Sequence, residues 1–167
     1  MAKQEIEEVT HKTVQTGGVL VKIYFDMQSE EKDQLQPLMA DFVNNSILKF
    51  PGVVYCFGTI DEPIAVDKGY STTSTLTVLF KDLGSLIGLV FRYTPAGVEI
   101  LKPEKDYVLK IPVLQSMLLD VANISLEYSK YIMSKVMKEE DYQKVLDDIK
   151  KREELGKKLL EKKDGQK

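Results

Sequence analysis

The stretch that decides the fold is residues 74–101, STLTVLFKDLGSLIGLVFRYTPAGVEIL. Its first part, 74–80, alternates polar and apolar residues, as a β-strand with one buried face does. Asp82 is a suitable helix N-cap, and the apolar residues after it recur at helical spacing (Leu83, Leu86, Ile87, Val90 and Phe91). Residues 94–97 (TPAG) break this helix, and 98–101 (VEIL) predicts another strand. The stretch therefore predicts a strand, a helix and a strand.

The residues before this stretch predict the same order of elements. Residues 19–25 (VLVKIYF) and 53–60 (VVYCFGTI) are rich in β-branched and aromatic residues, which favour strands. Between them, apolar residues recur at helical spacing until Pro51-Gly52 (Leu35, Leu38, Met39, Phe42 and Val43). The resulting order, β-α-β-β-α-β, predicts a ferredoxin-like α+β fold, with an antiparallel four-stranded sheet and both helices on one face.

The chain changes character after residue 104. Residues 107–111 favour a short fifth strand, and Pro112 fits the first turn of a long helix that ends near Met137. A second, highly charged helix is expected over about 139–163.

The patterns predict three parts. Residues 1–16 are expected to be an N-terminal tail or lead-in, with an added strand near Val14 as an option. Residues 17–111 are expected to form the ferredoxin-like core, and residues 112–167 a C-terminal extension of two helices. With 167 residues, one domain plus an appendage is a natural reading.

Composition and charge narrow the classes of function. The net charge is -3, and no lysine–arginine block stands apart from acidic residues, so the broad basic surface of a duplex-binding protein is not expected. The N-terminal residues are polar, and no window approaches the length of an apolar membrane span. The single cysteine cannot form an intrachain disulfide, which favours a reducing compartment. We therefore expect a cytoplasmic protein that binds neither membranes nor duplex nucleic acid.

The usual catalytic and cofactor signatures are not found. His11 is the only histidine and lies in the expected tail, and Cys56 lies in an apolar strand, where an inert buried thiol is favoured. Gly17-Gly18 precedes a strand rather than a helix, so it does not predict a phosphate-binding loop. No catalytic residue, metal ligand or cofactor is assigned, and a non-enzymatic role is favoured.

Two polar features are speculative ligand-binding candidates. Asp61, Glu62 and Asp67 lie in the loop between the second and third strands, where carboxylates could bind a hard cation or act as an acid–base pair. A solvated hairpin is the plainer interpretation. Arg92 could bind a carboxylate or phosphate next to two aromatic residues, or simply end a helix at the surface.

The first C-terminal helix is the most informative element for function. Both core helices lie on one face of the expected sheet, so the other face would need a cover, a partner or a ligand. The helix has a seam of apolar residues (Leu114, Met117, Val121, Ile124, Tyr128 and Tyr131), with Leu118, Ala122, Ile132 and Val136 beside it. We expect this association surface to cover the sheet, to join a second subunit in a homo-oligomer, with a dimer favoured, or to do both. An intrachain cap without a partner remains an alternative.

Two local resemblances accompany these patterns. FPGVVYCFGTIDEPI at 50–64, with FRYTPAGVEILKPEK at 91–105, resembles a family of small archaeal proteins without an established activity. The second segment is also similar to the end of the C-terminal ferredoxin-like module of WYL-domain transcriptional regulators. That likeness covers about 30 residues and rests on Tyr93, Pro95, Gly97, Val98, Leu101 and Pro103. It implies the same fold and a sensory or assembly role, without a catalytic residue.

Three functions follow as hypotheses. The first is a non-enzymatic binding or assembly module that senses a ligand or binds a protein as a homo-oligomer. The second is a small metal-assisted or acid–base enzyme that uses the loop carboxylates. The third is a single-stranded RNA-binding module that uses Arg92 and the strand aromatics Tyr24, Phe25, Tyr55 and Phe57.

Overall fold

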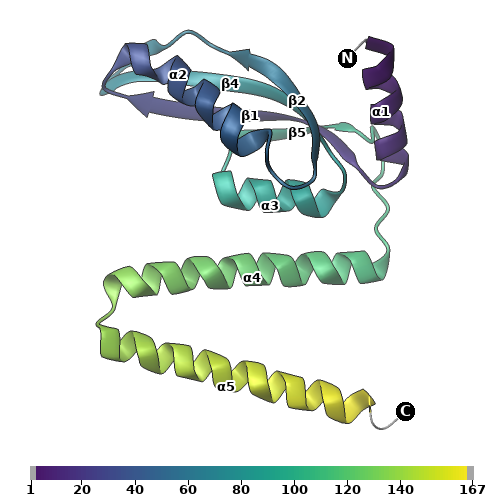
Figure 1. Cartoon of the computed structure of the whole chain (residues 1–167), viewed down its shortest axis with the longest axis vertical. Helices are drawn as coiled ribbons and strands as arrows, with labels where there is room; N and C mark the ends of the chain where they lie inside the picture. The colour runs from purple at the N-terminus through teal and green to yellow at the C-terminus, as the bar shows by residue number, and fades with distance from the viewer. Residues whose placement is uncertain (1–2, 165–167) are drawn as a thin grey trace. The chain divides into compact units, whose positions relative to one another are not determined.

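The computed structural model describes residues 3–164 and has a mixed α+β architecture (Figure 1). These residues form one five-stranded antiparallel sheet and five α-helices. The chain divides into two compact units, Met1–Val121 and Ala122–Lys167, and the boundary lies inside a long helix. The first unit contains the sheet, and the second contains the end of the long helix and the helix that follows it.

The sheet has the strand order β2-β4-β1-β5, with antiparallel neighbours throughout, and β3 pairs with β4 beside this order. The strands are β1 (Val19–Ser29), β2 (Val53–Ile60), β3 (Ile64–Val66), β4 (Gly69–Phe80) and β5 (Gly97–Lys102). The expected α+β class with an antiparallel sheet is confirmed. The sheet has one strand more than expected because part of the predicted loop 61–69 folds back on β4 as β3.

Two helices and a short π-helix bury one face of the sheet. They are α2 (Lys32–Phe42), which continues into the π-helix η1 (Val43–Ile47), and α3 (Leu83–Tyr93). The core joins alternate residues of β1 to residues of these elements: Val19, Val21, Ile23, Met39, Ile47, Leu86 and Leu89. As expected, Asp82 caps α3, because its Oδ1 accepts a hydrogen bond from the Ser85 backbone N–H at 2.7 Å.

The opposite face of the sheet is largely polar. Its side chains, in register across β2, β4 and β1, are Phe57, Thr59, Thr73, Thr75, Thr77, Lys22 and Tyr24. All of them are half-buried or exposed. An antiparallel sheet with hydroxyl and charged groups on one face is stable against water. The expectation that this face needs a cover, a partner or a ligand stays a prediction, and the polar groups on the face lessen the need for one.

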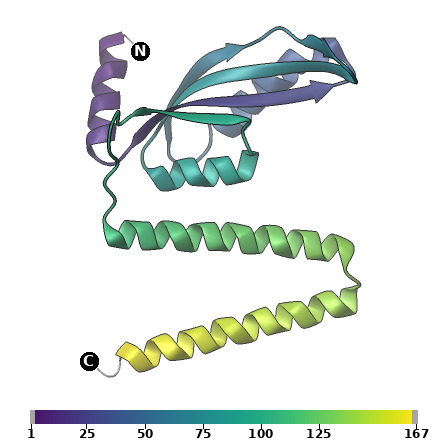
Figure 2. The same ribbon diagram turned by 180° about the vertical axis from the view of Figure 1, so that it is seen from behind.

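The N-terminal segment is a helix, which corrects the expected tail and the optional strand near Val14. Helix α1 (Lys3–Gln15) lies beside one end of the sheet (Figure 2). Thr10 Oγ1 and Tyr55 Oη lie 2.7 Å apart in a hydrogen bond. Leu79 has no exposed surface, although it pairs with Tyr55 on the polar face. The small apolar area of that face is thus buried at the end where α1 lies.

The C-terminal part contains the two expected helices but not the expected fifth strand. Residues 106–110 have no regular secondary structure, and the helices are α4 (Ile111–Val136) and α5 (Glu139–Asp164). Residues 107–111 do not pair with the sheet, and the Tyr107 hydroxyl instead donates a hydrogen bond to the carbonyl of Gly17, in the turn between α1 and β1. Within residues 3–164, no helix has the length and apolar character needed to cross a membrane.

Candidate functional site

The three loop carboxylates that the sequence singles out are all exposed. The backbone of Asp61 is fixed, because its N–H donates to Thr73 O at 2.9 Å and its carbonyl accepts from Thr72 Oγ1 at 2.6 Å. Glu62 lines a shallow groove of about 330 Å³ together with Lys32, Asp33, Gln36 and Pro63. Asp67 lies in the turn between β3 and β4.

No group of three or more His, Cys, Asp or Glu side chains able to hold a metal ion occurs among the described residues. Asp61 uses its backbone groups, rather than its carboxylate, to tie the β2–β3 connection to β4. The arrangement is that of a solvated hairpin.

Arg92 does not join the loop carboxylates. It is exposed in the last turn of α3, and its guanidinium lies 5.8 Å from the ring centre of Tyr93. Tyr93 in turn packs edge-on against Phe42 and Phe50. A cation at the C-terminal end of a helix also interacts favourably with the helix dipole. These contacts account for Arg92 as a surface residue that covers the edge of an aromatic cluster.

The strand aromatics divide between the two faces of the sheet. Phe25 is buried in the core, whereas Tyr24, Tyr55 and Phe57 belong to the polar face. Tyr55 and Phe57 are stacked with their ring centres 5.7 Å apart. Lys22, the base beside them, lies 3.9 Å from Glu99. The face therefore carries aromatic rings without the excess of positive charge that an RNA backbone requires.

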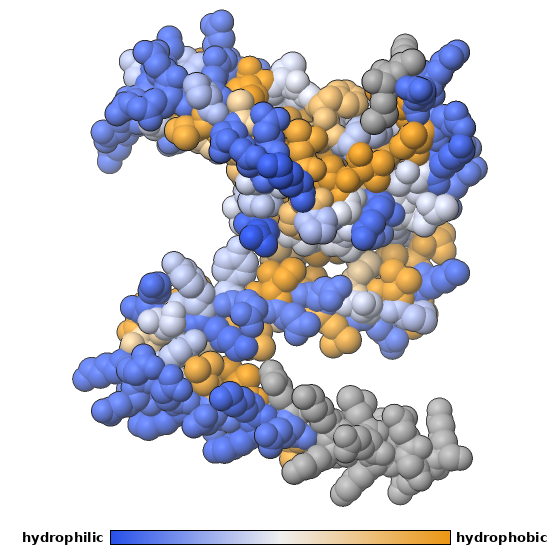
Figure 3. All heavy atoms as spheres, in the orientation of Figure 1, coloured by the Kyte–Doolittle hydropathy of each residue, from blue (hydrophilic) through white to orange (hydrophobic). Residues whose placement is uncertain are grey.

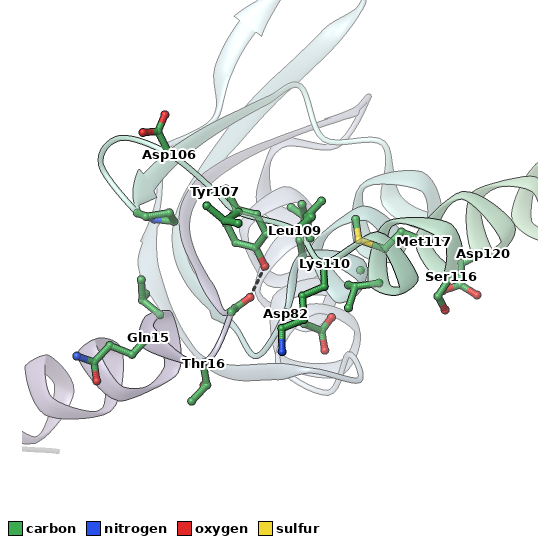
Figure 4. A pocket seen from close by; sticks show the side chains of 17 residues that line it. Gln15, Thr16, Asp82, Asp106, Tyr107, Leu109, Lys110, Ser116, Met117 and Asp120 are labelled. Atoms are coloured by element: carbon green, nitrogen blue, oxygen red, sulfur yellow. Dashed lines mark hydrogen bonds between the residues drawn. The ribbon is translucent and has the colours of Figure 1, made fainter.

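A cavity of about 920 Å³ lies in the first unit, where segments that are far apart in the sequence meet (Figure 4). Its walls come from the end of α1, the start of α3, residues 103–110 and the first turns of α4. Met117, Val113 and Leu83 give it apolar surface, while Asp106 and Asp120 are exposed carboxylates on its lining. The sequence does not predict this cavity, because no local pattern connects residue 14 with residue 120.

Tyr107 closes one side of this cavity. Burial raises the pKa of its hydroxyl, a hydrogen bond from the backbone of Leu83 opposes the rise, and the charge of Asp82 adds to it. The hydroxyl is therefore neutral at physiological pH and acts as a donor to Gly17 O. Its role is to hold residues 103–110 against the ends of α1 and α3.

Cys56 is a half-buried free thiol that packs against the core. Burial raises the pKa of the Cys56 thiol to about 11. The thiolate is the reactive form of cysteine, so a thiol with this pKa is a poor nucleophile. This agrees with the expectation of an inert structural cysteine.

We expect iodoacetamide at pH 8 to alkylate Cys56 on the order of 100-fold more slowly than a free cysteine, because far less thiolate is present. Mass spectrometry over a time course measures the rate. The same protein in denaturing urea is the control and should react at the rate of a free cysteine. Equal rates in the folded and denatured protein would show that the thiol is neither buried nor perturbed.

Helix α4 carries the predicted association seam, whose members differ in their surroundings. Met117 is buried in the first unit, and its Cγ lies 3.8 Å from the position that a Cβ on Gly84 would occupy. Val121 and Ile124 are half-buried, whereas Leu114, Tyr128 and Tyr131 are exposed. The first unit therefore buries Met117 of the seam, while three other members of the seam are exposed.

The exposed apolar residues of α4 are large and numerous. They are Ile111, Val113, Leu114, Leu118, Leu119, Tyr128, Tyr131, Ile132 and Val136. Leu118, Ile132 and Val136 are 62%, 56% and 74% exposed. Figure 3 shows apolar side chains at the surface along this helix. Apolar surface of this extent on one helix is typical of an interface rather than of a solvated surface.

The comparisons with known proteins give one match. A family model described as the MJ0538 family matches residues 20–154, which include all of the sheet except Val19, all of α4 and more than half of α5. No curated protein and no solved structure matches the chain. The expected resemblance to a family of small proteins agrees with this match, whereas the local likeness to WYL-domain regulators receives no support. The chain belongs to the MJ0538 family.

Proposed function

We propose that this protein is a non-enzymatic binding and assembly module that self-associates through helix α4. The exposure of large apolar side chains along α4 carries the proposal. In a monomer these side chains would remain in water, and their burial against a partner is favourable by roughly 25 cal/mol per Å².

The area available on α4 is sufficient for a specific dimer. Five large apolar residues share one side of the helix (Ile111, Leu114, Leu118, Ile132 and Val136), and each is more than one third exposed. At about 150–200 Å² per fully exposed large side chain, they offer on the order of 500 Å² per copy. A standard interface buries about 800 Å² per partner, which the flanking residues of α4 can supply.

We infer that the core is a ferredoxin-like module. The proposal is supported by the strand order β2-β4-β1-β5, by helices in the two crossover connections, and by their packing in one core with alternate residues of β1. In this view β3 is an addition to the hairpin between β2 and β4. The fold by itself carries no activity.

A binding role is favoured over an enzymatic one. Asp61, Glu62 and Asp67 are exposed on a hairpin, whereas Arg92 belongs to α3, where its guanidinium lies over the ring of the neighbouring Tyr93. The free, half-buried Cys56 suits the reducing cytoplasm, where we place the protein.

Multi-angle light scattering over a concentration series tests the proposal. We expect a mass of twice the 19.0 kDa of one chain at micromolar concentrations, with dissociation on dilution. A mass of 19.0 kDa at every concentration up to the millimolar range would contradict it.

A further inference from the structure

One stripe along α4 is exposed from end to end. Its residues are spaced by three or four positions and therefore lie on one side of the helix: Ile111, Leu114, Leu118, Ala122, Ser125, Ser129, Ile132 and Val136. Each of them is exposed. We call this set the α4 stripe. It lies beside the predicted seam and on a different side of the helix from Met117, which the first unit buries.

The size of the side chains along the α4 stripe follows a symmetric pattern. The large residues Leu118 and Ile132 lie seven positions on either side of Ser125, and Leu114 and Val136 lie eleven positions on either side. The residues near the middle, Ala122 and Ser129, are small. The stripe contains no charged residue. Reading it from either end thus gives the same order of large, small and large.

We propose that the α4 stripe binds the α4 stripe of a second copy, antiparallel, with the two helices crossing at Ser125. This pairing rests on the proposed function. It specifies that the partner is a second copy of the chain and that the two α4 helices are antiparallel. The small residues at the centre allow the helix axes to approach to about 8 Å, the close end of the usual range. The large residues then pack on both sides of the crossing, Leu118 against the partner's Ile132 and Leu114 against the partner's Val136.

A second copy fits this surface because a two-fold interface must be self-complementary. The paired large residues of the α4 stripe lie at equal distances on either side of Ser125, so two copies of the stripe can fit each other as such an interface requires. The large residues of the α4 stripe alone offer on the order of 500 Å² per copy, which reaches the roughly 1,000 Å² in total that a specific interface needs.

The distribution of charge favours the antiparallel direction. In the first half of α4, 111–123, the only charged residue is Asp120, whereas the second half contains Glu127, Lys130 and Lys135. The halves therefore carry net charges of -1 and +1, from one acid and from two bases with one acid. Antiparallel pairing brings halves of opposite sign together and also aligns the helix dipoles favourably. Parallel pairing would bring the two positive halves together.

Single cysteines on α4 test the geometry, in full-length protein with Cys56→Ala so that no other thiol is present. Ser125→Cys should form a disulfide-linked dimer under mild oxidation, because the two sulfurs meet at the crossing point. Val136→Cys should not link to itself, since the two copies of residue 136 would lie about 33 Å apart along the helix axis at 1.5 Å per residue. A mixture of Leu114→Cys and Val136→Cys chains should form linked heterodimers.

Ser134→Cys is the matched control, because Ser134 is exposed on the opposite side of the same helix. At 10 µM protein we expect Ser125→Cys to link about 100-fold faster than Ser134→Cys, the ratio of an effective concentration of about 1 mM within the dimer to the 10 µM concentration in solution. Self-linking of Val136→Cys as fast as Ser125→Cys would overturn the antiparallel direction. If Ser125→Cys links no faster than Ser134→Cys while light scattering still shows a dimer, the crossing at Ser125 is wrong and the proposed function stands. A monomeric protein overturns both.

Discussion

The double variant Leu118→Asp/Ile132→Asp is expected to be monomeric. In the proposed pair each Leu118 meets the partner's Ile132, so each dimer would bury two contacts between like charges in place of apolar packing. An unpaired buried charge costs several kcal/mol, and the dissociation constant should rise by at least about 1,000-fold. Sedimentation equilibrium measures the change.

Both substituted residues are exposed in one chain, so the fold of the single chain should persist. We expect the far-ultraviolet circular dichroism spectrum to change little. Asn123→Asp/Ser134→Asp is the matched control, because it changes the net charge equally at exposed positions outside the α4 stripe. This control should dimerise with nearly the affinity of the wild type. A double variant that dimerises as tightly as its control would place the interface elsewhere.

The second large effect concerns the two faces of the sheet. Phe80 has no exposed surface and belongs to the core, whereas Phe57 is 53% exposed on the polar face. Phe80→Ala should lower the free energy of unfolding by about 3–5 kcal/mol, because it removes a fully buried ring and leaves a cavity. Phe57→Ala should lower it by less than about 1 kcal/mol.

Urea denaturation of the two variants at the same protein concentration measures both values. The concentration must be fixed because association also stabilises the folded chain. Because both variants replace a phenylalanine of the same sheet by alanine, the larger loss of unfolding free energy identifies the buried face. A larger loss for Phe57→Ala than for Phe80→Ala would mean that the polar face, rather than the face under α2 and α3, is covered in solution.

Local patterns predict the elements that have a strong period and clear breakers. The alternation in 74–80 and the helical spacing after Asp82 correspond to β4 and α3, and Asp82 caps the helix as expected. These features depend on neighbouring residues only. The antiparallel α+β class follows from the order of such elements.

The parts that sequence patterns missed depend on contacts between distant residues. Helix α1 contacts the sheet through Thr10 and Tyr55, which are 45 positions apart, and nothing near Thr10 indicates that contact. Residues 107–111 have the composition of a strand, but Tyr107 bonds to Gly17 instead. The polar face of the sheet, by contrast, follows from a local pattern, because Thr73, Thr75 and Thr77 alternate with the buried residues of β4.

The association seam expected from the sequence and the proposed α4 stripe lie on the same helix and share Leu114, and association through either stays a prediction. The seam through Met117 has regular heptad spacing, and this spacing cannot show that the first unit buries Met117. The exposed fraction of each side chain separates the seam from the α4 stripe, and only the fold provides it.

Hydrogen–deuterium exchange of the full-length protein, measured at concentrations below and above its dissociation constant, tests association through α4 most directly. We predict that amides of residues 111–136 become more protected as the concentration rises, while amides of the β2–β3 connection do not change. Exchange in α4 that is independent of concentration, in a sample that light scattering shows to dimerise, would contradict the account.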